Sequence, residues 1–413
     1  MDIDFILQPW QRFGVHLGLE RIEQLLSSLG NPHHNVPIVH VAGTNGKGSV
    51  CAYLSSILTQ AGYKVGRYTS PHLVDWNERI CLNEQPISLE ALQSLLLQVI
   101  DAINPNTESP TQFEIITAAA WLYFAQNRVD IAVVEVGLGG RLDATNICRP
   151  LVTVITSISR EHWQQLGSTL TEIATEKAGI IKPRCPVVVG QLPLEAQKVV
   201  RSRITKLNCP AVLVEPALEL PAINGQRWAS YQNIDYPLPL LGGIQLNNSA
   251  IAISTIQVLQ QKGWKITTRA IAAGMKKTRW LGRLQWVKYG DLPLLIDGAH
   301  NPAAAQALRQ YADTLEAPVT WVIGMLSTKD HAEIFTALLR SLDSLHLVPV
   351  PDHSSATLLD LAALAQTICP NLATCQTHDD LFSALKTVQS DRPVILCGSL
   401  YLVGYFLKSL PAL

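Results

Sequence analysis

Short apolar runs alternate with longer amphipathic segments along most of the chain. Four runs are almost continuously apolar and rich in β-branched residues: residues 36–43, 130–137, 151–158 and 185–190. Runs of this kind are typical of strands that are buried on both faces of a parallel sheet. Between them, residues 49–62 and 111–129 carry apolar side chains at helical spacing. The alternation predicts a doubly wound α/β sheet with helices on both faces.

The pattern weakens between residues 200 and 245, where several prolines interrupt it, and resumes afterwards. Residues 247–263 have helical spacing, and three later apolar runs indicate strands at 319–325, 344–350 and 392–400. A chain of 413 residues is also too long for a single core. We therefore predict two domains: a P-loop-type doubly wound α/β domain over residues 1–284 and a smaller Rossmann-like α/β domain over 285–413.

Composition narrows the class of protein. Hydrophobic residues make up 47% and charged residues 16%, which excludes a disordered chain. The net charge is −1 and no polybasic run occurs, which counts against a nucleic-acid surface. Residues 1–14 lack a signal-peptide pattern, and the apolar runs are too short to span a bilayer. Eight cysteines without a C-x-x-C pair suit a reducing compartment. We expect a cytoplasmic monomer that binds neither nucleic acid nor membrane.

The segment GTNGKGS, residues 43–49, follows the first apolar run and opens the first helical segment. Backbone N–H groups in a glycine-rich turn, together with the positive end of a helix dipole, bind anions. Lys47 supplies a positive charge for terminal phosphates, and the Ser49 hydroxyl is placed to reach a magnesium ion. The spacing departs from the usual phosphate-binding loop, because Val41 replaces its first glycine and the hydroxyl comes one position late. An ordinary glycine turn is the alternative.

Six further motifs follow in order. They are TSPHLVDWNERI (69–80), EVGLGGRLDATN (135–146), SISREHWQQLG (157–167), EKAGIIKP (176–183), GRLQ (282–285) and DGAHNP (297–302). Together with GTNGKGS they resemble the folylpolyglutamate synthase and dihydrofolate synthase family, a branch of the Mur ligase superfamily. The resemblance extends from residue 16 to residue 404, and it explains the unusual loop spacing as the variant that this family uses.

The resemblance implies an ATP site that includes both the loop and later residues. The implied ATP-binding residues are Thr44, Asn45, Gly46, Lys47, Gly48, Ser49, Asn248, Arg283 and Asp297. The implied catalytic residues are Lys47, Lys177 and His300. Ile244 stands where the family commonly has histidine, so the adenine edge is expected to be held differently. For DGAHNP, a capped turn at the start of a helix is an alternative that is compatible with ligand binding.

The resemblance also implies two magnesium ions beside ATP. The implied ligands are Ser49, Ser70, Glu135 and His162. Glu135 ends an apolar strand, where a carboxylate is costly unless it is paired or metal-bound, and a solvated strand-end acid is the alternative. Histidine is an unusual magnesium ligand, so His162 rests on the resemblance alone. Lys177 is implied to be carbamylated and to bind the second ion, since burial favours the neutral, nucleophilic amine. A surface lysine paired with Glu172 or Glu176 is the alternative.

A pterin site is implied on the first domain. Its residues are Leu17, Gly18, Leu19, Phe113, Leu142, Asp143 and Ala144. An aromatic face suits stacking on a pterin, and a carboxylate accepts hydrogen bonds from ring N–H groups. As a bare residue, Phe113 is also compatible with a core position. Ser327 and Thr328 depart from the family's D-K-D ending, whereas Lys329 and Asp330 are retained, so the handling of glutamate is open.

The implied reaction is ATP-dependent amide formation. The carboxylate of dihydropteroate or of a reduced folate attacks the γ-phosphate of ATP, and the amine of L-glutamate then displaces phosphate from the acyl phosphate. One alternative is another Mur-type ligase that acts on a cell-wall or cyanophycin precursor. A second is a nucleotide-binding switch without ligase chemistry. The sequence does not decide whether the first glutamate is added, the glutamate tail is extended, or both.

Overall fold

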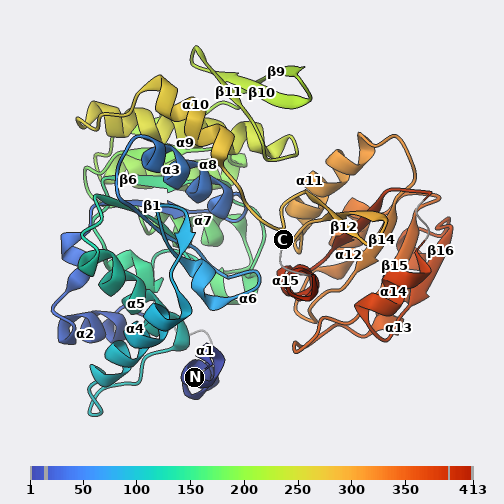
Figure 1. Ribbon diagram of the computed structural model, residues 1–413, viewed down its shortest axis with the longest axis horizontal. Coiled ribbons are helices and arrows are strands. Elements are labelled where there is room, and N and C mark those ends of the chain that lie inside the picture. The colour runs from blue at the N-terminus through green and yellow to red at the C-terminus, as the bar shows by residue number, and fades with distance from the viewer. Residues whose placement is uncertain (1, 14–16, 389–390, 411–413) are drawn as a thin grey trace. The chain divides into compact units, whose positions relative to one another are not determined.

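The computed structural model describes residues 2–13, 17–388 and 391–410 (Figure 1). It divides into two compact units. The first comprises Met1–Pro239 and Leu246–Arg279, and the second comprises Leu240–Gln245 and Trp280–Leu413. Each unit has its own sheet with helices packed against it, so the predicted two-part α/β fold is confirmed.

An eight-stranded sheet forms the centre of the first unit, in the order β4-β3-β2-β5-β1-β6-β7-β8. Its strands are β1 (Ile38–Ala42), β2 (Val65–Tyr68), β3 (Ile80–Leu82), β4 (Gln85–Pro86), β5 (Ile131–Glu135), β6 (Val152–Ile155), β7 (Val187–Val189) and β8 (Ala211–Leu213). From β2 to β8 all neighbours are parallel, whereas β3 pairs antiparallel with β2. Every residue of β1, β5 and β6 is buried, which explains their continuous apolar runs.

Helices surround this sheet. They are α1 (Ile3–Leu7), α2 (Glu20–Ser28), α3 (Lys47–Gln60), α4 (Leu89–Asp101), α5 (Gln112–Gln126), α6 (Trp163–Leu166), α7 (Leu170–Ala178), α8 (Leu194–Lys206), α9 (Ile244–Gln261) and α10 (Thr268–Lys277), with the short 3-10 helices η1 (Gln8–Phe13), η2 (Pro32–Asn35), η3 (Trp76–Arg79) and η4 (Ala144–Ile147). Helix α3 is buried along most of its length and packs closely on α10. A Cβ added to Gly274 would lie 2.4 Å from the Cα of Ile57, so this close packing needs glycine.

A second, antiparallel sheet occupies the region where the sequence pattern weakens. Its strands are β9 (Leu218–Ile223), β10 (Gln226–Tyr231) and β11 (Ile234–Pro237), in the order β11-β10-β9. Figure 1 shows it as a yellow-green ribbon separate from the main sheet. Five of the six residues of β9 are exposed, so the strand lacks the buried alternation that would have predicted it.

A six-stranded sheet forms the second unit, in the order β12-β13-β17-β14-β15-β16. Its strands are β12 (Gln285–Tyr289), β13 (Leu292–Ile296), β14 (Thr320–Ile323), β15 (Ser344–Leu347), β16 (Thr374–Thr377) and β17 (Val394–Cys397), and its helices are α11 (Pro302–Asp313), α12 (His331–Leu338), α13 (Leu358–Ile368), α14 (Leu381–Thr387) and α15 (Leu400–Ser409). All neighbours are parallel except β12 and β13.

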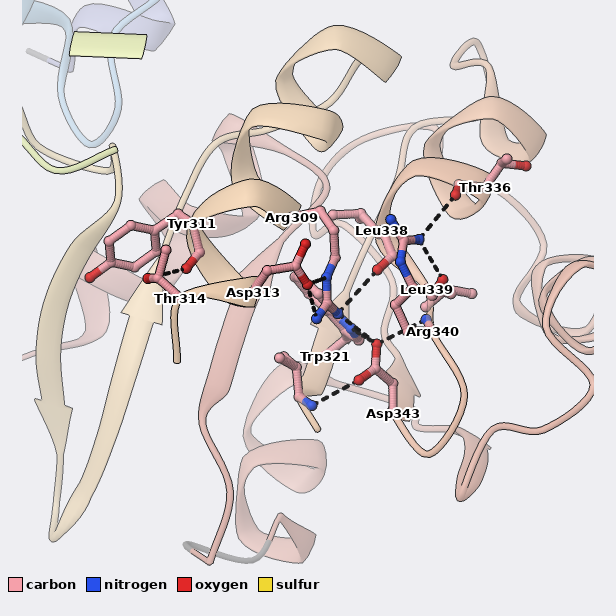
Figure 2. A network of polar contacts seen from close by, with 11 residues as sticks. Arg309, Tyr311, Asp313, Thr314, Trp321, Thr336, Leu338, Leu339, Arg340 and Asp343 are labelled. Carbon is pink, nitrogen blue, oxygen red and sulfur yellow. Dashed lines mark hydrogen bonds and ion pairs between the residues drawn. The ribbon is translucent and has the colours of Figure 1, made fainter. Parts of the chain in front are cut away.

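A buried ion pair joins the elements of the second unit (Figure 2). Arg309 of α11 lies 2.9 Å from Asp343, which precedes β15 and is 1% exposed. Asp343 also accepts hydrogen bonds from the indole of Trp321, at 3.0 Å, and from the backbone N–H of Val319, at 2.8 Å. These contacts connect α11, β14 and the start of β15, and they satisfy a carboxylate that would otherwise be costly to bury.

Candidate active site

The candidate site begins where the central parallel strands end. In the register of the sheet, Val41 of β1 lies beside Glu135 at the end of β5, and Ala42 lies beside Ile155 at the end of β6. The carboxyl edge of a parallel sheet is where ligands bind in doubly wound folds. The segment 43–49, called the phosphate loop below, leaves β1 at this edge and leads directly into α3.

Two glycines of the phosphate loop are required by geometry. Gly46 is the N-cap of α3 with φ of +84°, and a Cβ there would lie 2.5 Å from Oδ1 of Asn248. At Gly43 a Cβ would lie 1.9 Å from Oγ1 of Thr156. Gly46 therefore adopts a conformation that side chains disfavour, and both positions lack room for a side chain. The structure also places Asn248, predicted to bind ATP, directly against the loop.

Hydrogen bonds to the segment after β6 hold the loop in place. The N–H of Thr44 donates to the carbonyl of Ser157 at 2.7 Å, and the N–H of Asn45 donates to the Ser157 hydroxyl at 3.0 Å. The Thr44 hydroxyl bonds the backbone of Ser159. Gly48 and Ser49 lie in the first turn of α3, where backbone N–H groups and the helix dipole favour an anion.

Lys47, Ser70 and Glu135 meet at the strand ends. The amine of Lys47 lies 3.9 Å from Oε1 of Glu135 and donates to the carbonyl of Thr44 at 3.1 Å. The backbone N–H of Ser70 donates to Oε2 of Glu135 at 3.3 Å. Glu135 is 5% exposed, so the solvated strand-end alternative does not describe it. The site thus brings a cation and a buried carboxylate to the start of the phosphate-loop helix.

The residues at this point suit magnesium. Among the described residues, no group of three or more His, Cys, Asp or Glu side chains is placed to hold a metal ion. Magnesium does not need such a cage, because it keeps several waters and binds one or two protein ligands together with substrate phosphates. The hydroxyl of Ser49 and the buried carboxylate of Glu135 are oxygen ligands of that kind. His162 has an exposed side chain at the N-cap of α6, and its role as a ligand stays a prediction.

Lys177 lies inside the site and not on the surface. It is 4% exposed, and its amine donates a hydrogen bond of 2.8 Å to the carbonyl of Gly43 in the phosphate loop. Burial, reinforced by the positive charge of Lys47, lowers the pKa of Lys177 to about 7. Glu176 instead pairs with Arg141 at 2.9 Å, and Glu172 caps α7. The surface-lysine alternative is therefore wrong for this chain.

Two contacts join the three predicted pterin segments. The N–H of Gly18 donates to the carbonyl of Leu142 at 3.4 Å. Arg21, 7% exposed, donates from Nε to the carboxylate of Glu114 at 3.1 Å. The segments of Leu17–Leu19, Phe113 and Leu142–Ala144 thus lie together in the first unit, although about 95 residues separate the first from the second in the sequence. The remaining predicted residues of these segments, Leu17, Leu19 and Ala144, are half-buried or buried.

Phe113 covers a glycine of the loop after β5. A Cβ on Gly137 would lie 2.4 Å from Cζ of Phe113, so the ring rests directly on the backbone there. The ring centroid is 6.3 Å from that of Tyr68, and Phe113 is only half-buried. The ring therefore packs on the core and also keeps an accessible part, so the core interpretation and the stacking interpretation are both compatible with its position.

Asp297, Arg283 and His300 form a separate cluster in the second unit. Asp297 follows β13 and accepts hydrogen bonds from the N–H groups of Leu284 and Ala299, at 2.9 and 2.8 Å. Burial raises the pKa of Asp297, and the charge of Arg283 opposes this shift. Nδ1 of His300 lies 2.7 Å from the carbonyl of Gly298. Since a carbonyl only accepts, Nδ1 carries the proton when the ring is neutral.

The sequence interpretation did not include several residues of these clusters. Ser399 caps α15 directly after β17, is 2% exposed, and follows Gly398, whose N–H donates to Ala299 beside Asp297. A serine between an apolar strand and a helical pattern was the available signal. Arg21 and Glu114 gave no such signal, because nothing local connects two charged residues 93 positions apart.

Within the described residues, no helix is both long and apolar enough to cross a membrane.

Comparisons with known proteins show which proteins this chain is similar to. The model of the Mur ligase middle domain matches residues 41–256, and that of the dihydrofolate synthetase C-terminal domain matches residues 283–409. The folylpolyglutamate synthase of Lacticaseibacillus casei is 36% identical over 400 residues, which cover 93% of this chain and 92% of that protein. The dihydrofolate synthase/folylpolyglutamate synthase of Bacillus subtilis is 35% identical over 420 residues, covering 97% and 96%. The solved structure of Escherichia coli FolC in complex with DHPP and ADP is similar with a TM-score of 0.83 and 30% identity, over 97% of both chains.

Proposed function

The chain belongs to the folylpolyglutamate synthase and dihydrofolate synthase family of Mur-type ligases, and from that premise we propose that it joins L-glutamate to both dihydropteroate and reduced folates. The enzyme is an ATP-dependent ligase. One observation supports the dual acceptor most: the three pterin segments are tied together by the Gly18–Leu142 and Arg21–Glu114 contacts, within the same unit as the phosphate loop. A pterin site assembled in this way serves either acceptor, because both carry the same ring system.

ATP binds, in this proposal, with its phosphates on the loop 43–49. The backbone N–H groups of the first turn of α3 face the phosphate oxygens, and Lys47 balances the charge that develops on the γ-phosphate during transfer. Ser49 and Glu135 would hold magnesium, with Ser70 and His162 as the further ligands that the family resemblance implies. Magnesium, when bound, neutralises phosphate oxygens and orients them for in-line transfer.

Lys177 is proposed to be carbamylated. With its pKa lowered to about 7, a large fraction of its amine is neutral near neutral pH and therefore able to attack carbon dioxide. The product is an anion on a buried helix position beside Gly43, where it would add a ligand for a second magnesium ion. The hydrogen bond to Gly43 fixes the amine at the phosphate loop and supports this assignment.

The chemistry proceeds in two steps. The acceptor carboxylate attacks the γ-phosphate of ATP, ADP leaves, and an acyl phosphate forms. The amine of L-glutamate then attacks the acyl carbon, phosphate leaves, and the nitrogen loses a proton to give the amide. Arg283 and Asp297 are proposed to contact ATP, and His300 is proposed to act on the amine of L-glutamate. Water must be excluded during these steps, because an acyl phosphate hydrolyses readily.

The roles proposed for the two parts of the chain follow the predicted domain boundaries. Residues 1–284 are proposed to supply the phosphate loop and the pterin site, and residues 285–413 are proposed to supply Asp297 and the glutamate side of the reaction. We further propose that the enzyme acts as a monomer in the cytoplasm without nucleic-acid or membrane partners. A sedimentation-velocity experiment on the purified protein tests the monomer directly.

An acceptor screen tests the function. Phosphate release from ATP is measured with glutamate and, in turn, dihydropteroate, a reduced folate monoglutamate, or a cell-wall precursor. We expect release with the first two acceptors only, and none when glutamate is left out. Release with the cell-wall precursor alone would favour a different Mur-type ligase, and release that ignores both glutamate and acceptor would favour a nucleotide-binding switch.

A further inference from the structure

A chain of buried polar side chains links the middle of β1 to the segment that follows β5. His40 lies in the middle of β1 and is 0% exposed. Its Nε2 is 2.9 Å from the hydroxyl of Thr145, and that hydroxyl is 2.5 Å from Oδ1 of Asp143. On the other side of the ring, Nδ1 is 3.6 Å from the thiol of Cys148. None of these four residues is more than 4% exposed.

The partners of Asp143 set the direction of every hydrogen bond in this chain. Asp143 accepts from the N–H of Leu138 at Oδ2, at 2.8 Å, and from the N–H of Thr145 at Oδ1, at 3.0 Å. Burial raises the pKa of Asp143, whereas these donors favour the ionised form, which can only accept. The Thr145 hydroxyl must then donate to Asp143 and accept from Nε2–H of His40. His40 is neutral, since burial lowers its pKa to about 3, so its Nδ1 accepts from the thiol of Cys148.

The carboxylate of Asp143 connects two parts of the loop that carries it. We call residues 137–145 the acceptor loop, because it carries Leu142, Asp143 and Ala144 of the proposed pterin site. Both oxygens of Asp143 accept hydrogen bonds from this loop, at Leu138 and at Thr145. These hydrogen bonds hold Asp143 in one orientation within the loop. The carbonyl of Leu142, next to it, is the one that accepts from Gly18.

A histidine at position 40 is not needed to form the strand. The other residues of β1 are Ile38, Val39, Val41 and Ala42, all fully buried and all apolar. A buried polar ring in such a strand is costly unless it is hydrogen-bonded, and an apolar side chain would fill the position without that requirement. The same strand continues into the phosphate loop, so the ring connects the backbone that holds ATP to the loop that holds the acceptor.

We propose that His40 and Thr145 are positioning residues that hold Asp143, and through it the acceptor loop, in the conformation that binds the pterin ring. The inference rests on the proposed function, since it presumes a pterin acceptor. It adds a specificity element of buried residues, which connects β1 to the acceptor loop by directed hydrogen bonds.

The test compares two substitutions at one position. Thr145→Val keeps the size and shape of the side chain but removes the hydroxyl, whereas Thr145→Ser keeps the hydroxyl and serves as the matched control. Steady-state kinetics are measured for dihydropteroate and for ATP. We expect Thr145→Val to raise the KM for dihydropteroate by about tenfold, a typical effect of one lost buried hydrogen bond, with the KM for ATP changed less than about twofold. Thr145→Ser should stay close to wild type for both.

A second pair of variants distinguishes weaker binding from a folding defect. His40→Gln retains an amide N–H able to reach the Thr145 hydroxyl, whereas His40→Leu retains only the volume. Calorimetric binding of dihydropteroate in the presence of ADP, together with melting temperatures, separates weaker binding from unfolding. We expect weaker binding for His40→Leu and rescue by His40→Gln.

Three outcomes would overturn the inference. One is an unchanged dihydropteroate KM in Thr145→Val. Another is an equal rise in the KM values for dihydropteroate and ATP, which indicates general damage. The third is equally weak binding by both His40 variants. A wild-type enzyme that turns over no pterin acceptor would instead refute the proposed function, and the inference would fall with it.

Discussion

Lys177 on helix α7 donates a hydrogen bond of 2.8 Å to the carbonyl of Gly43, the first residue of the phosphate loop. This contact spans 134 positions in the sequence and places a buried amine where ATP phosphates are proposed to bind. A full positive charge at a buried position is costly, and here it lies near the positive charge of Lys47. The environment therefore favours a neutral amine, which is the form that reacts with carbon dioxide.

The first prediction concerns this amine. Since its pKa is lowered to about 7, the neutral fraction rises as the pH passes upward through 7 and falls to about a tenth at pH 6. Carbamate formation should follow the same direction. Carbon-13 NMR of the protein with labelled bicarbonate should show a carbamate signal that weakens below pH 7 and is absent in Lys177→Ala.

Lys177→Ala should also be nearly inactive and partly rescued by short-chain carboxylates, which replace the missing anion. Lys182→Ala offers a matched control. Lys182 lies five residues after Lys177, and its amine donates a hydrogen bond to the carbonyl of Asn146 and not to the phosphate loop. An active wild-type enzyme with no carbamate signal at pH 8 would contradict the assignment.

The second prediction concerns the metal. Glu135→Gln keeps the shape of the side chain and removes its charge at the end of β5. We expect the magnesium concentration for half-maximal activity to rise by about tenfold or more, since carboxylates are the preferred protein ligands of this ion. Activity is titrated with magnesium at fixed ATP for wild type and variant. Superimposable titrations would show that Glu135 serves only to pair with Lys47.

The third prediction concerns the pterin ring. Removing one stacking face costs about 0.5–1.5 kcal/mol in addition to the loss of buried area, so the two losses together should raise the KM for dihydropteroate in Phe113→Ala by about tenfold or more. Long-tailed folates should be affected less, because their glutamates make contacts of their own. Both acceptors are assayed on the same preparation. Small and equal effects would mean that Phe113 only fills space above Gly137.

The fourth prediction concerns the second unit. Asp343→Ala leaves the guanidinium of Arg309 buried without its 2.9 Å partner and also removes the acceptor for Trp321 (Figure 2). Breaking a buried pair in this way costs about 3–5 kcal/mol. Asp313→Ala is the control, because Asp313 also bonds Arg309 but is 54% exposed, and exposed pairs contribute at most about 1 kcal/mol. Hydrogen exchange of β14 and β15, followed by mass spectrometry, should accelerate strongly in the first variant alone.

The phosphate loop and the central strands were predictable because their signals are local. A continuous apolar run, three glycines with Lys47 and a helical pattern follow each other within about 25 residues of sequence. Burial of β1, β5 and β6 on both faces produces that signal directly. Two strands gave no such local signal. Most residues of β9 and β16 are exposed to solvent, so neither strand shows an alternation of apolar and polar residues.

The contacts that assemble the site could not be predicted from the sequence, for a different reason. Arg21 and Glu114 pair across 93 positions, and His40 reaches Thr145 across 105. The second contact depends on the order of strands in the sheet, which places β5 beside β1. The pattern of a single chain predicts the strands but not this order, so it gave no signal that His40 contacts Thr145.

The dual acceptor is the central claim, and product analysis tests it most directly. The purified enzyme is incubated with ATP, magnesium and glutamate, with dihydropteroate alone, with a reduced folate monoglutamate alone, and with both, and products are identified by mass. We predict one added glutamate on dihydropteroate, one or more on the folate, and competitive inhibition of each reaction by the other acceptor. Glutamylation of only one acceptor, or two reactions that do not compete, would contradict the account.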